Sequence, residues 1–162
     1  MRQEDTHTPE PLGSASDTAR IDNTNHFNGF LDAIIDATGI GLWDWDLVTG
    51  RVIYSRQWEI IAGYEPGTLP QTVASWEKAL LPEDLKRAEA EIDRHLAGKT
   101  NRYETEFRMR RTDGTLVWAQ DKGFDTEWDE NGKPVRLIGV VEDINRIKET
   151  EEKLKEQTEQ LD

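Results

Sequence analysis

Residues 102–144 read RYETEFRMRRTDGTLVWAQDKGFDTEWDENGKPVRLIGVVEDI, and two turn signals divide this stretch into three parts. The signals are Asp113-Gly114 and Asn131-Gly132. Each stands between runs in which apolar and polar residues alternate, and such dipeptides favour tight reversals because both central residues can adopt a positive φ. The stretch therefore predicts three long antiparallel strands, over residues 102–110, 115–128 and 135–143.

The alternation assigns side chains to the two faces of this sheet. Four residues of the first of these strands point one way, namely Tyr103, Thr105, Phe107 and Met109. In the last strand, one face carries Leu137, Gly139 and Val141, and the other carries Ile138 and Val140. Because both faces of that strand are apolar, we expect it to be central and covered on both sides.

Two shorter strands and several helices are predicted before this stretch. Residues 40–46 form a strand that presents Trp43 and Trp45 on one face, and Thr49-Gly50 joins it to a strand over residues 51–54. We expect helices at residues 56–63, around Trp76 and from Pro82 to Gly98. Proline suits the first turn of that last helix, where its missing N–H is not needed.

The N-terminal region divides into a leader and a helix. Residues 1–23 are polar and contain two prolines and one glycine, so we expect a disordered leader. Residues 24–38 predict an amphipathic helix because apolar residues recur at helical spacing, namely Phe27, Phe30, Leu31, Ile34 and Ile35. In one interpretation, this stripe packs on the outside of the sheet or at a dimer contact. In the other, it packs into the core of one domain.

The C-terminal region, residues 145–162, predicts a charged helix. Ile147, Leu154 and Leu161 are spaced by seven, which gives half of a coiled-coil seam. This spacing predicts a connector to a partner domain. The alternative is a solvated helix that has no partner.

Size and charge limit the function. The chain has 162 residues, which suits one domain with extensions. It has no cysteine, which excludes disulfides, thiolate metal sites and cysteine nucleophiles. The formal net charge of −13 disfavours nucleic acid and anionic membrane as partners. Neither a signal peptide nor a membrane-spanning run is evident, so we expect a cytoplasmic protein.

The acidic residues do not predict catalysis or a metal site. Asp44 and Asp46 share one strand face, but no nucleophile or oxyanion donor accompanies them. Residues 127–132 superficially resemble a calcium loop, yet Ile138 stands where the acidic ligand is needed. We therefore expect neither catalytic residues nor metal ligands.

Residues 28–148 resemble a PAS sensor domain, of the variety whose first strand carries tryptophans. The segments that carry the resemblance are GIGLWDWD (39–46), RQWEIIAGY (56–64), LPED (81–84), YETEFRMRRTDG (103–114), Trp118, GKPV (132–135) and LIGVVEDI (137–144). The chain departs from the family at two places. Leu81 replaces the histidine of a His-Pro-x-Asp motif, which removes a polar cap. Asn145 replaces the threonine of an Asp-Ile-Thr motif, and we expect it to cap the following helix.

The resemblance implies an α+β PAS fold over residues 39–144, with a five-stranded antiparallel sheet flanked by short helices. It implies a regulatory input domain, often dimeric, that feeds an output domain such as a histidine kinase or a cyclic-dinucleotide enzyme. The signal would pass from the concave face of the sheet, through Asp143, Ile144 and Asn145, into a signalling helix over residues 145–162.

A ligand pocket on that concave face is the corresponding site prediction. Its candidate residues are Trp43, Trp45, Phe107, Met109, Asp121, Leu137 and Val141. Alternatively, the two indoles fill the space, and the domain is a ligand-free scaffold for interaction or dimerisation. Asp121 is a buried carboxyl that needs a partner if its strand face is interior, and otherwise it is solvated or salt-bridged.

The identity of any cofactor stays open at this point. Some PAS domains hold haem through a histidine on the long helix, where this chain has His95. The sequence around His95 gives no further haem signal, and it favours a surface or boundary histidine. A cysteine-linked flavin is excluded because the chain has no cysteine. A non-covalent flavin has no supporting signal.

Overall fold

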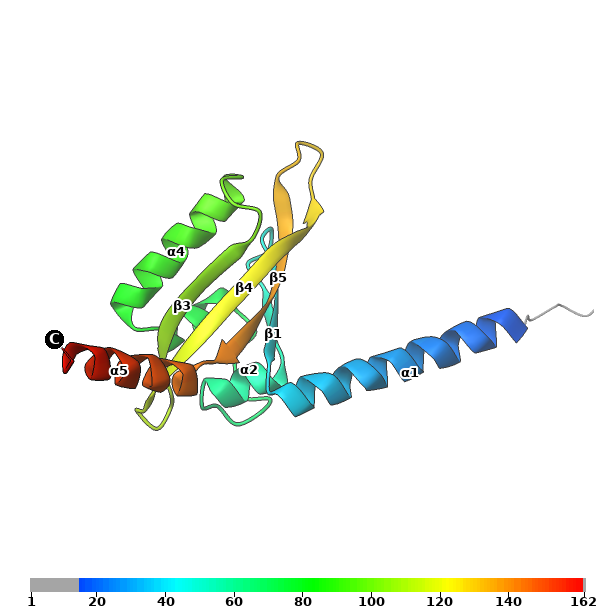
Figure 1. Cartoon of the computed structure of the whole chain (residues 1–162). Coiled ribbons are helices and arrows are strands. Elements are labelled where there is room, and N and C mark those ends of the chain that lie inside the picture. The colour runs from blue at the N-terminus through cyan, green and yellow to red at the C-terminus, as the bar shows by residue number, and fades with distance from the viewer. Residues whose placement is uncertain (1–14, 162) are drawn as a thin grey trace, which may run out of the picture. The chain divides into compact units, whose positions relative to one another are not determined.

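A computed structural model describes residues 15–161 of the chain, and the side chains of residues 25–161 (Figure 1). Residues 1–14 of the expected leader lie outside the described residues. Helix α1, Ala15–Thr38, begins before residue 24, where we expected the helix to start. Extending an existing helix costs less than nucleating one, and alanine and arginine in this segment favour the extension.

The chain forms two compact units, of which one contains most of α1 and the other begins at Thr38. The apolar stripe predicted for α1 is present on the helix. Phe27, Phe30, Leu31 and Ile34 are all exposed. The helix therefore presents an apolar face that is not buried in a core.

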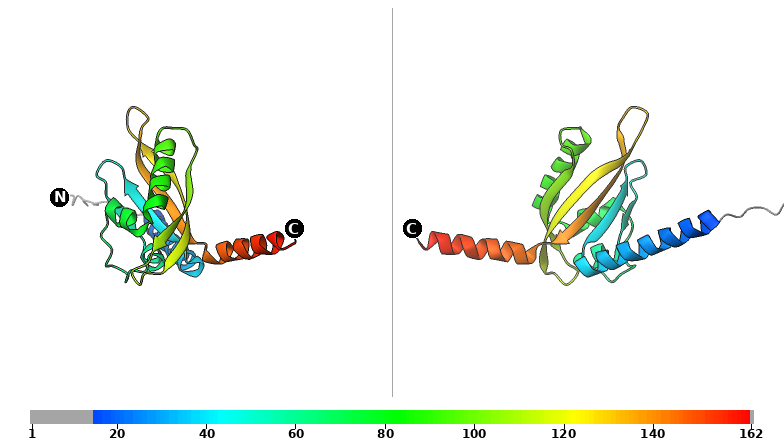
Figure 2. Two further views of the ribbon diagram at one scale, coloured as in Figure 1. Left: turned by 90° about the vertical axis from the view of Figure 1, so that its left-hand side faces the viewer. Right: turned by 45° about the vertical axis from the view of Figure 1, so that its right-hand side comes forward.

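The second unit contains a five-stranded antiparallel sheet in the order β2-β1-β5-β4-β3 (Figure 2). Its strands are β1 Gly41–Asp46, β2 Val52–Tyr54, β3 Tyr103–Arg110, β4 Leu116–Trp128 and β5 Pro134–Asp143. Strand β5 is central, as its two apolar faces predict. The predicted fold class is confirmed.

The two long hairpins turn differently from the prediction. Gly114 and Gly132 have a φ of 85° and 75°, but no residue other than glycine has a positive φ in the described part of the chain. The Gly114 amide bonds to the Arg111 carbonyl, and the Arg111 amide bonds to the Thr115 carbonyl. This pattern is typical of a longer loop that places a single glycine in the left-handed region. The turn positions are therefore right, and the two-residue turn type is wrong.

Three helices lie between the second and third strands of the chain: α2 Arg56–Ile61, α3 Val73–Ala79 and α4 Pro82–Leu96 (Figure 1). The first turn of α4 has no side-chain cap at Leu81. Instead, Asp84 accepts hydrogen bonds from the Arg108 amide at 2.7 Å and from the Arg108 guanidinium at 2.8 and 2.9 Å. These bonds join α4 to β3 where the family's capping histidine is missing.

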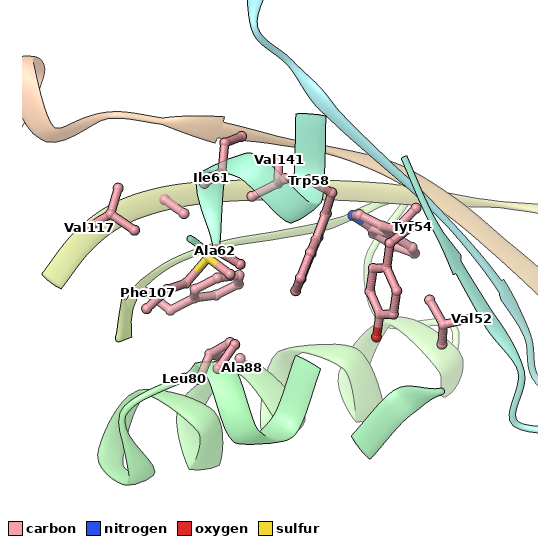
Figure 3. Close-up of a cluster of buried hydrophobic side chains, with 14 of the residues drawn as sticks. Val52, Tyr54, Trp58, Ile61, Ala62, Leu80, Ala88, Phe107, Val117 and Val141 are labelled. Carbon is pink, nitrogen blue, oxygen red and sulfur yellow. The ribbon is translucent and has the colours of Figure 1, made fainter. Parts of the chain in front are cut away.

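The core lies between the sheet and these helices. Figure 3 shows Trp58 beside Tyr54, and Phe107 near Ala62 and Leu80. The Tyr54 and Trp58 rings lie 4.3 Å apart between centroids. Strand residues and helix residues together form this cluster, so burial of apolar surface joins the two layers.

The opposite face of the sheet is more open than predicted. Ile138 and Val140 are half-buried, and their neighbours Ile53 and Phe124 are 49% and 53% exposed. Within the unit that begins at Thr38, this second face of β5 is only partly covered. The prediction that both faces are covered is therefore wrong there. The apolar residues of this face form a shallow groove, which Leu42, Ile53, Phe124 and Ile138 help to line.

Helix α5, Asn145–Glu159, follows β5 after one residue (Figure 2). Ile147 and Leu154 are 56% and 59% exposed, whereas Leu161 lies beyond the end of the helix. The predicted seam is therefore shorter by one position. No helix among residues 15–161 is both long and apolar enough to cross a membrane.

Candidate functional site

Two glycines set the shape of the inner face of the sheet. Trp43 of β1 is level with Gly139 of β5, which faces Gly123 of β4, which in turn faces Tyr103 of β3. The Trp43 ring lies so close to both glycines that an added Cβ at either position would collide with it. The indole can therefore extend across the sheet because two neighbouring strands carry no side chain there.

The Trp43 indole ends at Asp121. Its Nε1–H donates a hydrogen bond of 2.6 Å to Oδ1 of the carboxyl group. The indole also meets the Tyr103 ring edge to face, with centroids 6.3 Å apart and planes at 71°. Asp121 is 4% exposed and Tyr103 is 1% exposed, so both polar groups are held inside the domain.

A small cavity lies beside this arrangement, with a volume of about 30 Å³. A single water molecule needs roughly 10–15 Å³ of such space, so the cavity has room for about two or three molecules of that size. Its wall comes from four strands and three helices, through Trp43, Trp45, Val52, Tyr54, Trp58, Val73, Trp76, Ile92, Tyr103 and Asp121.

Three polar atoms of the wall lack a hydrogen-bond partner among the described residues. They are the indole nitrogens of Trp45 and Trp76 and the hydroxyl of Tyr103. The Tyr103 hydroxyl lies near enough to Asp121 for hydrogen bonding between the two side chains to lower the pKa of the carboxyl, but the contact falls outside standard hydrogen-bond geometry. Buried polar groups are usually satisfied, so an unpaired cluster around a cavity is typical of a site that takes a polar guest.

The charge state of Asp121 depends on its burial. Burial raises the pKa of the Asp121 carboxyl to about 7, against the opposing effect of the hydrogen bond from Trp43. Burial and the neighbouring Asp121 charge also raise the pKa of the Tyr103 hydroxyl. Among the described residues, Asp121 forms no ion pair with a lysine, arginine or histidine within 4 Å. It is a buried carboxyl without a counter-charge, which is typical of functional sites.

The structure brings together three of the seven predicted pocket residues. Trp43, Trp45 and Asp121 line the cavity. The other four are fully buried and belong to the packed core rather than to the cavity wall, namely Phe107, Met109, Leu137 and Val141. Asp121 is buried and bonded to an indole, not solvated or salt-bridged.

Sequence reasoning missed most of the aromatic wall. Tyr103 was assigned correctly to the inner face, but alternation alone does not show that its hydroxyl is unpaired. Trp58 and Trp76 belong to short helices whose orientation the sequence does not specify. The signal that could have found them is the number of tryptophans in this short region of the chain.

His95 is not the surface or boundary residue that we expected. Its side chain is 2% exposed, and Nε2 lies 3.0 Å from Asp125. Nδ1 lies 3.1 Å from both the carbonyl and the hydroxyl oxygen of Thr100. Both ring nitrogens are therefore engaged, and the 30 Å³ cavity is far too small for a haem or a flavin. Neither cofactor fits this arrangement.

The predicted relay residues lie where the sheet meets α5. The Ile144 amide bonds to the Trp118 carbonyl at 2.8 Å, and the Asn145 side-chain oxygen accepts a bond from the Trp118 amide at 2.6 Å. We predicted that Asn145 caps α5, and this is wrong: its side-chain oxygen accepts the bond from β4, and α5 has no side-chain cap. Asp143 accepts a bond from the Asn145 amide at 2.9 Å instead.

Charged side chains reinforce this junction. Lys148 of α5 and Arg108 of β3 lie 4.9 and 5.3 Å from the centre of the Trp118 ring, within the range of cation–π attraction. Lys148 also pairs with Glu106 at 2.5 Å, and Arg111 pairs with Asp143 at 3.3 Å. These contacts join the first turn of α5 to β3 and β4.

The chain matches a known protein family and resembles a curated protein. Residues 51–141 match the PAS fold family. Over 129 residues, the chain is 29% identical to a probable diguanylate cyclase, DgcE, from Escherichia coli (strain K12). The match covers 78% of this chain but spans 11% of the length of that protein.

Solved structures agree with this match. A sensory box histidine kinase/response regulator from Burkholderia thailandensis E264 is 30% identical, with a TM-score of 0.70, over 81% of this chain and 96% of that chain. The N-terminal domain of a diguanylate cyclase with PAS/PAC sensor from Marinobacter aquaeolei is 24% identical, with a TM-score of 0.56, over 65% of this chain and 94% of that chain. The second likeness concerns the fold alone.

Proposed function

The chain belongs to the PAS fold family of sensor domains, and on that premise we propose that it is an input module that binds a small ligand in its interior cavity. The observation that carries this proposal is the buried Asp121 carboxyl, which faces a cavity with unpaired polar groups and has no counter-charge in the described chain. A guest would satisfy groups that the protein leaves unsatisfied. We assign no catalytic step to the module.

The proposed route out of the site runs along the sheet to α5. Asp121 is level with Val141 of β5, two residues before Asp143. Trp118 of β4 holds Ile144 and Asn145 through its backbone. A guest that prefers one arrangement of β4 and β5 would shift the population of α5 positions, by no more than its difference in affinity for the two arrangements.

The proposed output is an enzyme such as a histidine kinase or a cyclic-dinucleotide enzyme. Support comes from the 30% identical sensory box histidine kinase/response regulator and from the probable diguanylate cyclase. We also propose that the module is a homodimer. The exposed stripe of α1, which contains Phe27, Phe30 and Ile34, and the exposed Ile147, Leu154 and Leu161 supply apolar surface for that contact.

A screen for thermal stabilisation tests the binding proposal. Small amines, alcohols and carboxylic acids would be added to the wild type and to Val73→Leu, whose extra carbon occupies cavity space. We expect at least one class to raise the Tm of the wild type and to act more weakly on the variant. Stabilisation of both proteins to the same degree would place the binding outside the cavity.

Paired spin labels test the relay. The chain has no cysteine, so labels attach only at cysteines introduced at the exposed Lys78 of α3 and Glu152 of α5. A stabilising compound should change the distance distribution between the labels. If no compound stabilises the protein and the distances never change, the module does not sense a ligand.

A ligand-free scaffold is the second candidate function. The small volume of the cavity and the close packing around Phe107, Met109 and Val117 favour it. In that case the domain contributes dimerisation and a rigid connection to α5. The thermal screen and the spin-label measurement separate the candidates, because no compound moves α5 in a scaffold.

A further inference from the structure

We propose that the interior cavity binds a small primary ammonium cation, with the Asp121 carboxylate as its counter-charge and the surrounding aromatic rings as its wall. The inference rests on the proposed ligand-sensing function and specifies the chemical class of the ligand. Four observations support it: the charge of the wall, its aromatic composition, its unpaired oxygen and its volume.

The charged groups that line the cavity or act on its tyrosines are acidic. Asp121 is the one carboxylic acid among the lining residues, and the wall contains no lysine, arginine or histidine. Glu77 of α3 and Glu91 of α4 act electrostatically on Tyr54 and Tyr103, the two titratable hydroxyls that face the site. A second anion would meet only like charges there, whereas a cation would be attracted by each of them.

The wall is rich in electron-rich rings. Six of the lining residues are tryptophan or tyrosine, namely Trp43, Trp45, Tyr54, Trp58, Trp76 and Tyr103. The faces of such rings attract cations, and cages of this kind recognise ammonium groups. Aromatic rings combined with one carboxylate therefore select a monocation over a neutral apolar guest.

An unpaired oxygen gives the site a place for an ammonium N–H. The Tyr103 hydroxyl is almost fully buried and lines the cavity; it interacts with Asp121 but makes no hydrogen bond of standard geometry with any described residue. A hydroxyl oxygen can accept a bond from a cation, and so can the Asp121 carboxylate. The indole N–H groups of Trp45 and Trp76 are donors, so they require an acceptor such as water or a ligand hydroxyl and set no charge preference.

The cost of ionising Asp121 in the empty site also favours a cation as the guest. Burial raises the pKa of Asp121 to about 7, because the ionised carboxylate is poorly solvated there. A cation would replace the missing solvation and favour ionisation. The volume of about 30 Å³ limits the guest to a nitrogen and about one carbon.

Binding of methylammonium chloride, followed by calorimetry and by Tm at pH 8, tests the inference. Potassium chloride and sodium acetate at equal ionic strength are the control salts. We expect saturable binding of methylammonium, no binding of acetate, and potassium at least tenfold weaker, because it offers no N–H. Below pH 7, each pH unit should weaken methylammonium binding by up to tenfold, as Asp121 becomes protonated.

Two variants locate the binding. Asp121→Asn keeps an acceptor for Trp43 but loses the charge, so methylammonium binding should disappear. Tyr103→Phe loses one oxygen and should weaken binding several-fold, and it provides the test if Asp121→Asn does not fold by near-ultraviolet circular dichroism. The inference is wrong if acetate binds instead, if potassium binds equally well, or if both variants bind methylammonium like the wild type.

The outcomes separate this inference from the proposed function. If methylammonium fails but an alcohol or an acid binds in the cavity and moves α5, the ligand class is wrong and the sensory role stands. If no class binds, both proposals fail.

Discussion

Gly123 and Gly139 determine where the Trp43 indole can lie, and through it the position of the Asp121 carboxyl. The ring occupies the space where side chains of β4 and β5 would stand. Its nitrogen then reaches Asp121 at 2.6 Å. Neither glycine has a positive φ, so close approach rather than backbone conformation explains both of them.

Replacing Gly139 with alanine should therefore destabilise the domain by about 1–3 kcal/mol, because the added Cβ meets the Trp43 ring and a backbone oxygen of β4. Chemical denaturation measures the loss. Gly29→Ala is the control, since an added Cβ at Gly29 in α1 has no atom within 4 Å. Equal stability of Gly139→Ala and the wild type would contradict the packing described for Trp43.

Replacing Asp121 with asparagine should change the pH dependence of stability. Burial raises the folded-state pKa of Asp121 from 3.8 to about 7, so the folded protein keeps a proton that the unfolded chain releases between these values. The protonated Asp121 carboxyl makes its full contribution to the free energy of unfolding below about pH 4, and this contribution is lost as the pH rises to 7.

Asparagine does not ionise, so the free energy of unfolding of Asp121→Asn should rise relative to the wild type between pH 4 and pH 8, by at most about 4 kcal/mol. Denaturation of both proteins at several pH values measures the difference. A constant difference across this range would mean that Asp121 has an ordinary pKa.

Single residues also show where sequence reasoning stops. Alternation placed Asp121 on the same strand face as Ala119 and Gly123, which is correct, but it did not decide that this face is interior. The 2.6 Å bond joins residues 78 positions apart, and no local pattern encodes it. Similarly, the substitution at Leu81 predicted an altered turn, while the compensating Asp84–Arg108 bonds appear only in three dimensions.

Among the elements, α5 is attached to the sheet through its junction with β4. The Trp118 backbone bonds to Ile144 and Asn145, and its ring makes a cation–π contact with the Lys148 ammonium. These contacts fix the first turn of a helix that has no buried residue of its own. The orientation of α5 therefore depends on few interactions.

Removing one of them should loosen the junction. Asn145→Ala leaves the Trp118 amide without its acceptor, so we expect faster hydrogen exchange at that amide and a loss of about 1 kcal/mol in stability. Asn145→Asp keeps an oxygen at the same place and should stay close to the wild type. Unchanged exchange in the alanine variant would show that Asn145 does not hold the junction.

Element positions were easier to predict than their connections. The five strands and the long helix lie within about two residues of their predicted bounds, because alternation, Pro82 and the turn glycines are local signals. The turn type was wrong because an aspartate carboxylate holds each loop: Asp129 accepts bonds from the Asn131 and Lys133 amides, and Asp113 acts in the other loop. The Asp113 carboxylate accepts a bond from the Thr115 amide, and its backbone stays at negative φ.

At the scale of the whole molecule, exposed apolar residues gather on α1 and α5. Phe27, Phe30 and Ile34 on α1 and Ile147 and Leu154 on α5 are each more than 40% exposed. Exposed apolar stripes on helices are typical of contacts between chains. The cavity, in contrast, needs side chains from seven elements, so its volume could not follow from any segment of the sequence.

Removing residues 149–162 should weaken self-association if α5 contributes to a dimer. The truncated chain keeps Asn145 and Lys148, so the junction with β4 is preserved. Sedimentation equilibrium measures the dissociation constant, which we expect to increase at least tenfold. Phe27→Ser with Phe30→Ser tests the stripe of α1 separately. Unchanged association of the truncated chain would show that the tail is not the dimer contact.

The hydrogen bond between Trp43 and a buried, titrating Asp121 can be followed through the indole N–H signal of Trp43 in ¹H–¹⁵N NMR spectra, recorded as the pH is raised from 5 to 9. If Trp43 donates to a buried Asp121, its signal should shift with an apparent pKa near 7 and stop titrating in Asp121→Asn. The signal of Trp128, which is 55% exposed, serves as the internal control. A Trp43 signal that does not move between pH 5 and pH 9 would contradict the account.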